Sequence, residues 1–531
     1  MVTPPGCDPP PVRPVWIVGV LGHRRLDDPA TLGARIEEQL RGLATAVAAR
    51  GGETHAYVSA AAGTDLLAIR AARSLGLPVH ILLPLDEAEF LEDFAEFPAW
   101  RDEAGAALAE ARAHPRRDSV QVAPTTGQRP SCYFDADARI VEGADVIVAV
   151  WNGTAAAGLG GTGQTVPLAR ALGKPILRID PATGQAERSG FPPGEWPPRD
   201  EKWDWLQART AVAPLPPGSR ETEAASLQGL KARLSAIARW DSSNFRRKAL
   251  LALQVTATAG VLGLVNLLLT GRVHWTIPLA ITGAQSVLLV WTKVIKSHLK
   301  RSKVNDDWIQ ARLGAELWRG VVATYPAAGG MHPIAGRRLP EWRRFAVSVG
   351  IASQKLDRPL DLSQPGDLEE FKSGYVERLQ AQIAHFEQQR DRSQLRTHRL
   401  LIVAHYCFLL APWSVGLALL IRAAGKITIL VPSPDAMSSL GVLVFTAVLP
   451  AALPLGAATA TALVENFDHD RRANRYDEMP TLLRRRLAEL PHLHTADSVR
   501  AFVERCEESL LKESIEWVAA QQHIAILSLG R

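Results

Sequence analysis

Cysteine is scarce in this chain of 531 residues, which contains only four. Cys7, Cys132, Cys407 and Cys506 lie far apart in the sequence, so neither a disulfide scaffold nor a zinc site of closely spaced cysteines is expected. The histidines are scattered as well, and no metal site is predicted. Because 47% of the residues are hydrophobic, a disordered chain is also excluded. The length allows roughly three or four domains of ordinary size.

Charge is missing from four long segments, although 22% of all residues are charged. The first segment, 249–270, would form a helix of about 33 Å, enough to cross a hydrocarbon core of about 30 Å. The others are 273–292, 400–421 and 438–464. A buried core helix is the alternative for any one of them, but the length of all four argues against it. We therefore predict four membrane-spanning helices, arranged as two hairpins.

Basic residues flank the two predicted hairpins on one side. They cluster at 246–248, 293–303, 390–399 and 471–475, whereas the hairpin turns contain few. By the positive-inside rule we expect a multi-pass protein of the inner (cytoplasmic) membrane, with both termini and the long middle segment cytoplasmic. We attribute the net charge of +5 mostly to these clusters and to contact with anionic lipid, so nucleic acid is not an expected partner. Residues 1–14 are Pro-rich without an apolar run, which predicts a disordered N-terminus and no cleavable signal peptide.

The N-terminal third of the chain alternates short apolar runs with helical patterns. The expected strands are 15–20, 54–59, 79–85, 120–122, 145–150 and 175–180. Repeated strand–helix–strand units predict an α/β domain with a parallel sheet and helices on both of its faces. In sheets of this kind the ligand lies beyond the carboxyl ends of the strands.

Three loops at those carboxyl ends carry residues suited to an anion. Glycines let the backbone approach a ligand closely, and Arg24 or Arg25 can pair with a phosphate. Thr64 or Asp65 can cap a helix and reach a ribose hydroxyl. The predicted ligand-binding residues are Gly22, His23, Arg24, Gly63, Thr64, Asp65, Gly160, Gly161, Thr162 and Gly163. Each loop by itself is compatible with a plain tight turn, but three that converge favour a nucleotide site. A Walker A sequence is absent, so NTP hydrolysis by that route is not expected, and no catalytic residue is assigned.

The motifs VGVLGHR at 18–24, AAAGTD at 60–65 and GGTG at 160–163 together resemble the SLOG superfamily, over about residues 15–180. That superfamily shares a Rossmann-like fold with the cytokinin-activating phosphoribohydrolases and includes the cytosolic ligand-binding region of TRPM channels. In the hydrolases a Gly-Gly-x-Gly-Thr motif precedes a catalytic glutamate, whereas QTVP at 164–167 stands here. The resemblance therefore implies that the domain senses a nucleotide-derived ligand, ADP-ribose-like or a cyclic nucleotide, without hydrolysing it.

The apolar helices resemble SLATT domains, predicted pore-forming effectors that accompany nucleotide-signal modules in bacterial conflict systems. A helical stripe of Trp308, Arg312 and Glu316 matches the cytoplasmic extensions of those domains, although most such stripes are packing positions in a bundle. The resemblance implies an all-α membrane region with helical extensions and a homo-oligomeric pore. The expected division is a disordered N-terminus at 1–14, a sensor at 15–181, a connector at 182–247, membrane hairpins at 248–293 and 400–464, and cytoplasmic helical regions at 294–399 and 465–531.

Uncharged polar residues within the predicted spans are candidates for lining a pore. We single out Gln254, Thr258, Gln285 and His405, together with Glu465 at the cytoplasmic end of the fourth span. Such residues are costly in lipid unless they face protein or water, and hydrogen bonding between helices is the alternative for each of them. No charged residue lies at a predicted bilayer midplane, which favours a passive pore over ion-coupled transport.

These patterns predict a membrane-embedded effector that is gated when its cytosolic SLOG domain binds a nucleotide-derived messenger, in the setting of bacterial defence. A membrane-tethered nucleotide N-ribohydrolase and a non-catalytic membrane scaffold are the alternatives. Release of free base from nucleotides would favour the hydrolase. A melting temperature that no nucleotide shifts would favour the scaffold.

Overall fold

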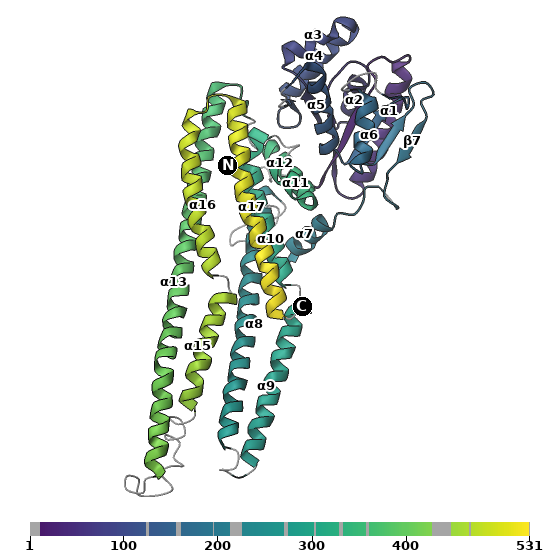
Figure 1. Ribbon diagram of the computed structural model, residues 1–531. Coiled ribbons are helices and arrows are strands. Elements are labelled where there is room, and N and C mark those ends of the chain that lie inside the picture. The colour runs from purple at the N-terminus through teal and green to yellow at the C-terminus, as the bar shows by residue number, and fades with distance from the viewer. Residues whose placement is uncertain are drawn as a thin grey trace, which may run out of the picture. The chain divides into compact units, whose positions relative to one another are not determined.

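The computed structural model describes an N-terminal α/β domain followed by an all-helical region (Figure 1). The described residues are 11–123, 127–155, 161–194, 196–212, 226–269, 274, 276–301, 304–328, 333–356, 360–426, 448–466 and 469–529. The chain divides into two compact units, each assembled from stretches that are far apart in sequence. Unit 1 comprises Met1–Leu234, Gly314–Gly374 and His492–Leu511, and unit 2 comprises Ser235–Leu313, Tyr375–Pro491 and Lys512–Arg531.

Unit 1 contains a seven-stranded sheet in the order β4-β3-β2-β1-β5-β6-β7. The strands are β1 (Val15–Gly22), β2 (Glu53–Val58), β3 (Val79–Leu83), β4 (Ser119–Val122), β5 (Val146–Val150), β6 (Ile176–Ile179) and β7 (Ala186–Ser189). Six of them run parallel, which confirms the prediction of a Rossmann-like α/β domain. The order reverses between β1 and β5, and this switch point is where sheets of this type bind ligands.

The seventh strand departs from the predicted all-parallel sheet. β7 pairs with β6 antiparallel, so the sheet is mixed at this edge. The physical reason is the short connection between them, because a tight turn can only join antiparallel neighbours. Asp180 and Gly184 close that turn through their backbone, and Gly184 has the positive φ of +67° that the turn requires.

The central strands are buried on both faces. Every residue of β5 (VIVAV) is buried, as is every residue of β1 except Gly22. Such continuous apolar runs are typical of parallel strands covered by helices on both sides. On one face α1 (Pro29–Ala48), α2 (Thr64–Ser74) and α4 (Pro98–Ala113) share a core with β1 and β2, and on the other α5 (Arg129–Gly143) and α6 (Thr162–Ala171) do so.

A further helix, α12 (Arg343–Leu356), completes the second helical layer, although it lies far beyond the sheet in sequence. Its Val347 and Ile351 belong to the same core as Ile17 and Tyr57. The backbone N–H of Val15 also donates a hydrogen bond to Oγ of Ser348 at 3.0 Å. The hydrophobic layer under β1 and β2 is therefore built partly from the middle of the chain.

The rest of the described chain is helical. The remaining helices are α3 (Glu87–Glu92), α7 (Glu201–Val212), α8 (Leu227–Leu269), α9 (Thr276–Arg301), α10 (Val304–Ala328), α11 (Ile334–Arg338), α13 (Pro365–Lys426), α15 (Leu449–Asn466), α16 (His469–Glu489) and α17 (Ala496–Leu529), with short 3₁₀ turns η1 (Asp93–Glu96), η3 (Pro340–Trp342) and η6 (Leu490–His492). Four of these helices, α8, α10, α13 and α17, contribute residues to both units.

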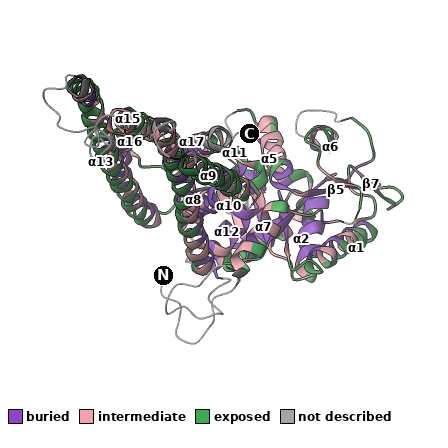
Figure 2. Cartoon of the chain, turned by 90° about the horizontal axis from the view of Figure 1, so that it is seen from below, coloured by how far each residue is buried: buried purple, intermediate pink, exposed green. Residues whose placement is uncertain are grey.

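Two of the described helices are long and apolar enough to cross a membrane: α9 over Thr276–Ile295, and the apolar part of α13, which ends at Ile421. In the most apolar window of each, only 6% and 11% of the residues are buried, and both helices are mostly green in Figure 2. A core helix would be largely buried, so this exposure favours an apolar environment for both. These two helices correspond to the second and third predicted spans.

The sequence predicted four spans, and the described residues contain two candidates. The first predicted span is the second half of α8, which is helical up to Leu269 but is not among the two candidates. The fourth, 438–464, falls partly outside the described residues. Its described part, 448–464, lies mostly in α15, which is not among the two candidates.

Candidate functional site

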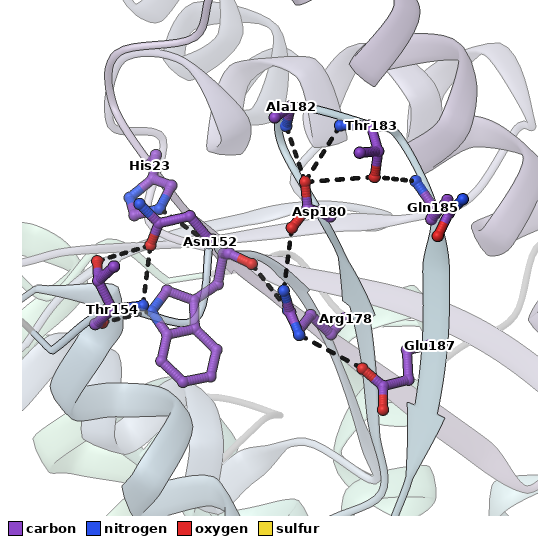
Figure 3. Close-up of polar contacts among 10 residues, drawn as sticks. His23, Asn152, Thr154, Arg178, Asp180, Ala182, Thr183, Gln185 and Glu187 are labelled. Carbon is purple, nitrogen blue, oxygen red and sulfur yellow. Dashed lines mark hydrogen bonds and ion pairs between the residues drawn. The ribbon is translucent and has the colours of Figure 1, made fainter.

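The candidate site lies at the switch point of the sheet, beyond the carboxyl ends of β1 and β5. His23 follows β1, and its backbone N–H donates to the carbonyl of Val150 at 3.3 Å. Its ring Nε2 accepts a hydrogen bond from the backbone N–H of Asn152 at 3.3 Å (Figure 3). The imidazole thus joins the loop after β1 to the loop after β5, which makes His23 a positioning residue in this arrangement.

The loops after β1 and β2 pack so closely that two glycines are required. A Cβ on Gly22 would lie 2.4 Å from Oγ1 of Thr64, and one on Gly63 would lie 2.5 Å from the carbonyl oxygen of Arg24. Gly63 also has a φ of +82°, a conformation that favours glycine. Thr64 donates from both N–H and Oγ1 to the carbonyl of His23, at 3.2 and 3.0 Å. These predicted residues are brought together, and their contacts fix the loops to each other.

Two carboxyl groups with shifted pKa values lie at this edge of the sheet. Asp65, in the first turn of α2, is 7% exposed and accepts a hydrogen bond from the backbone N–H of Ala61 at 3.0 Å. Burial, together with the nearby charge of Asp137, raises the pKa of Asp65 to about 8. Burial raises the pKa of Asp137 to about 7, although Thr165 Oγ1 donates to it at 3.3 Å. Near neutral pH the pair therefore holds protons that ordinary carboxyl groups would have released.

Arg24 supplies the positive charge of the site. Its field lowers the pKa of both Asp65 and Asp137 and opposes the effect of burial. The guanidinium lies 4.5 Å from the centroid of the Tyr133 ring, which is a cation–π distance. Tyr133 Oη in turn donates to the carboxylate of Asp93. The guanidinium of Arg24, which is predicted to bind phosphate, thus packs against the ring of Tyr133 on α5.

Asp137 and Tyr133 were not among the residues predicted from the sequence. Both lie on α5, whereas the prediction considered only loops that follow strands. Their spacing of four residues places them on one face of that helix, and this was the available signal. Asp137 brings a carboxyl group to the first turns of α6, where Oγ1 of Thr165 donates to it at 3.3 Å.

The third predicted loop reaches the same edge through the start of α6. Gly160 lies outside the described residues, Gly161 is the N-cap, and Thr162 and Gly163 form the first turn. Oγ1 of Thr165 contacts both the carbonyl of Gly161, at 3.2 Å, and Asp137. The partial positive charge of a helix N-terminus therefore lies close to the acid pair, an arrangement that suits a ligand with a phosphate group.

The loop after β5 is held in place by polar contacts from β6 (Figure 3). Arg178 donates from Nε to the carbonyl of Trp151 at 3.0 Å and pairs through Nη2 with Asp180 at 3.0 Å. Asn152 Oδ1 accepts from both the N–H and the hydroxyl of Thr154, at 3.1 and 2.7 Å. Because Asn152 is the partner of His23, these contacts also fix the position of His23.

The candidate pore residues all belong to unit 2. Gln285 contacts α8 at Gly263, where an added Cβ would lie 2.6 Å from Nε2 of the glutamine. Gln254 and Thr258 are exposed one turn apart on α8, and His405 is exposed on α13. Glu465 lies in α15, and its side chain is outside the described residues.

Other polar side chains join α8 to α9 by hydrogen bonds. Asn266 Nδ2 donates to Thr282 Oγ1 at 2.7 Å, and the hydroxyls of Thr256 and Thr292 lie 3.4 Å apart. These contacts match the alternative interpretation of polar residues in the spans, namely hydrogen bonding between helices.

Fold and site together define the class: an α/β domain of the Rossmann-like type, with a switch-point site made of glycine loops, one arginine and two carboxyl groups. No protein-family model matches the chain, and none of the curated proteins matches it. Among the described residues, no group of three or more His, Cys, Asp or Glu could hold a metal ion.

Proposed function

We propose that unit 1 is a SLOG-like sensor that binds a nucleotide-derived ligand at the switch point, and that the chain is a ligand-gated effector of the inner membrane. The observation that carries the proposal is the meeting of three glycine loops around Arg24, Asp65 and Asp137 at the carboxyl edge of the sheet. In bacterial defence, such a protein would convert a messenger into a change of membrane permeability.

The chemistry of the site suits a ribonucleotide. Arg24 and the N-terminus of α6 would bind phosphate, because both present N–H donors and positive charge. The carboxyl groups of Asp65 and Asp137 would accept hydrogen bonds from ribose hydroxyls. An ADP-ribose-like molecule or a cyclic nucleotide carries both kinds of group.

The helical region supports an effector role. α12 packs on the sheet that carries the site, and the next long helix along the chain, α13, contains a candidate span. A ligand that changes the loops at one end of the strands can therefore act on a helix that belongs to the same core. We propose that a SLATT-like homo-oligomer forms a passive pore, with Gln254, Thr258, Gln285, His405 and Glu465 as the candidate lining residues.

The test begins with ligand binding. A thermal-shift screen of the purified full chain over ADP-ribose, cyclic ADP-ribose isomers, cyclic dinucleotides and NAD should find a stabilising ligand. Arg24→Ala should weaken its binding by at least about tenfold, the value of one charge-assisted hydrogen bond. Arg41→Ala is the matched control, because its exposed side chain pairs with Glu37 on the same helix, α1.

The second step of the test is flux. Liposomes that contain the chain should become permeable when the stabilising ligand is added on the side of unit 1. Stabilisation without flux would contradict the effector role and leave a sensor. No stabilisation by any of these molecules would contradict the whole proposal and favour a membrane scaffold.

A nucleotide N-ribohydrolase is the second candidate, and the acid pair is the observation that favours it. A carboxyl group with a pKa of about 7 or 8 can be protonated at neutral pH and so act as a general acid toward a leaving base. Incubation with nucleotides followed by chromatography of free base tests this. Activity that survives in both Asp65→Asn and Asp137→Asn would exclude the pair as its source.

A further inference from the structure

One face of α13 carries a stripe in which arginines are followed without interruption by apolar side chains. The spacing alternates between four and three residues, so the members lie on one side of the helix. The stripe consists of Arg392, Arg396, Arg399, Val403, Tyr406, Leu410, Trp413, Leu417 and Leu420. All nine are exposed, and Trp413 is the most exposed of the apolar ones at 74%.

The packing of α13 explains why the side chains of this stripe are exposed. A neighbouring face of the same helix is made of small side chains, and these are buried. They are Ser393, Thr397, Ala404, Ser414 and Ala418. The helix therefore packs through its small residues, and the large apolar and basic side chains of the stripe stay exposed among the residues that the structure describes.

The arginines of the stripe have no acidic partner among the residues that the structure describes. Asp391 and Asp477, two acidic groups of this region, both form ion pairs with Arg390, at 3.1 and 3.2 Å. Arg392, Arg396 and Arg399 thus present three guanidinium groups over about 10 Å of helix. The apolar part that follows, from Val403 to Leu420, extends for about 26 Å.

We propose that the stripe is a binding site for one anionic phospholipid, with the phosphate on the three arginines and an acyl chain along the apolar side chains. Charge complementarity fits this occupant, and its acyl chain would cover the first half of the 26 Å apolar part, since one leaflet is about half of a hydrocarbon core of about 30 Å. Guanidinium groups bind phosphate in a forked geometry, and the cytoplasmic leaflet is rich in anionic lipid. A second copy of the chain fits less well, because parallel pairing would bring three arginines against three arginines.

The inference rests on the membrane location in the proposed function, and the experiment separates the two. The full chain is incubated with vesicles of equal parts phosphatidylglycerol and phosphatidylcholine, and flotation reports insertion. Inserted protein is then extracted in detergent, and native mass spectrometry counts the lipids that stay bound. The wild type should float and retain phosphatidylglycerol over phosphatidylcholine by about a hundredfold, given a contribution of about fivefold for each of the three arginines at an anionic surface.

The decisive variant is Arg392→Gln, Arg396→Gln, Arg399→Gln. It should still float but lose the preference for phosphatidylglycerol. The matched control replaces three exposed arginines outside the stripe, Arg101, Arg116 and Arg485, by glutamine, and should keep the preference. If the glutamine variant does not fold, the corresponding triple lysine variant serves in its place and should retain less phosphatidylglycerol than the wild type, because lysine lacks the forked geometry.

Each other result overturns the inference. A wild type that floats but retains both lipids equally contradicts the site and leaves the membrane location intact. Equal loss in the control variant means that total charge, not the stripe, selects the lipid. A dimer that disappears in the glutamine variant identifies the occupant as a second chain. A wild type that does not float contradicts the proposed function together with the site.

Discussion

Nδ1 of His55 and Nε2 of His80 lie 2.8 Å apart in the core of unit 1, with ring planes only 6° from parallel. Both imidazoles are fully buried on neighbouring strands. His80 Nδ1 contacts Oγ of Ser119 at 2.8 Å. On the other side, Nε2 of His55 lies 3.6 Å from Glu53, which also pairs with Lys355 of α12.

The histidine pair should make unit 1 sensitive to acid. Burial lowers the pKa of His55, and burial lowers that of His80 well below its usual range. The unfolded chain takes up a proton at each histidine below about pH 6.5, whereas the folded chain does not. The contribution of the histidine pair to the stability should therefore fall as the pH drops below 6.5, by at most about 1.4 kcal/mol per pH unit and histidine. Hydrogen exchange of β2 and β3 between pH 7.5 and 5.5 measures this.

The control for the histidine pair is His80→Gln, which keeps a polar partner for Ser119 and removes one titrating group. Its acid sensitivity should be smaller than that of the wild type. The test compares how steeply the stability of each protein changes with pH. This difference is needed because the titration of Asp65 and Asp137 changes the stability in the opposite direction over part of this pH range. Equal slopes in both proteins would contradict the prediction.

The acid pair should make unit 1 less stable at alkaline pH. Asp65 and Asp137 have folded pKa values of about 8 and about 7, far above the value of about 3.9 in an unfolded chain. The stability that a raised carboxyl pKa provides is lost as the pH rises through the folded value. The contribution of the pair should therefore lower the melting temperature from about pH 4 up to about pH 8 and level off above that. Asp137→Asn should flatten this decline, since it removes one titrating group and lowers the pKa of Asp65.

Asp135→Asn is the matched control for the acid pair, because it changes the same residue type on the same helix α5 outside the site. It should leave this decline of the wild type unchanged. An equally flat profile in both variants would show that another group on the chain is responsible.

Gly22→Ala should destabilise the two-loop arrangement by about 1–3 kcal/mol, the usual cost of overpacking. The added Cβ would lie 2.4 Å from Thr64, which is itself fixed by two hydrogen bonds. Gly42→Ala, in an open position of α1, should instead stabilise by roughly 0.5–1 kcal/mol. Denaturant unfolding of both variants tests the contrast, and a Gly22→Ala protein as stable as the wild type would contradict the tight packing.

Asp145→Asn should loosen α12 from the sheet. Burial alone would raise the pKa of Asp145, but Arg343 at 2.8 Å and Arg344 at 3.2 Å hold it below its usual range. Removal of one partner from such a buried group costs roughly 3 kcal/mol, because the arginines lose their counter-charge. Hydrogen exchange of 343–356 should rise.

The control for Asp145 is Glu38→Gln, which breaks an exposed pair with Arg35 and should cost less than about 1 kcal/mol. Its effect on the exchange of α12 should be nil. Unchanged protection of 343–356 from hydrogen exchange in the Asp145 variant would mean that the apolar contacts of Val347 and Ile351 are enough to hold α12 on the sheet.

The centre of the sheet was predictable because β1 and β5 are continuous apolar runs, which are typical of buried parallel strands. β7 (AERS) was not predicted, because it is polar and mostly exposed. The loops were predictable because glycine and the residues after it mark the ends of those strands. Gly22, Gly63 and Thr64 accordingly meet at one edge. Asp137 was not predictable in the same way, because its role depends on the three-dimensional packing of α5 against α6.

The helical region was less predictable. Hydropathy found α9 and the apolar part of α13, because their exposed side chains are almost all apolar. It treated 294–399 as a single cytoplasmic region, although α12 within that range packs on the sheet. The periodicity of a helix shows which face is apolar but not what that face will contact, so this partner could not be found from the sequence.

The position of α12 sets an order of events during synthesis. The strands of the sheet leave the ribosome first, α9 follows, and α12 comes only after it, 167 residues beyond the end of β7. At about 5–20 residues per second that is a delay of roughly 8–33 seconds. Throughout that time Ile17 and Tyr57 are without their covering helix. The core of unit 1 therefore cannot be completed until the first candidate span, α9, has already been made.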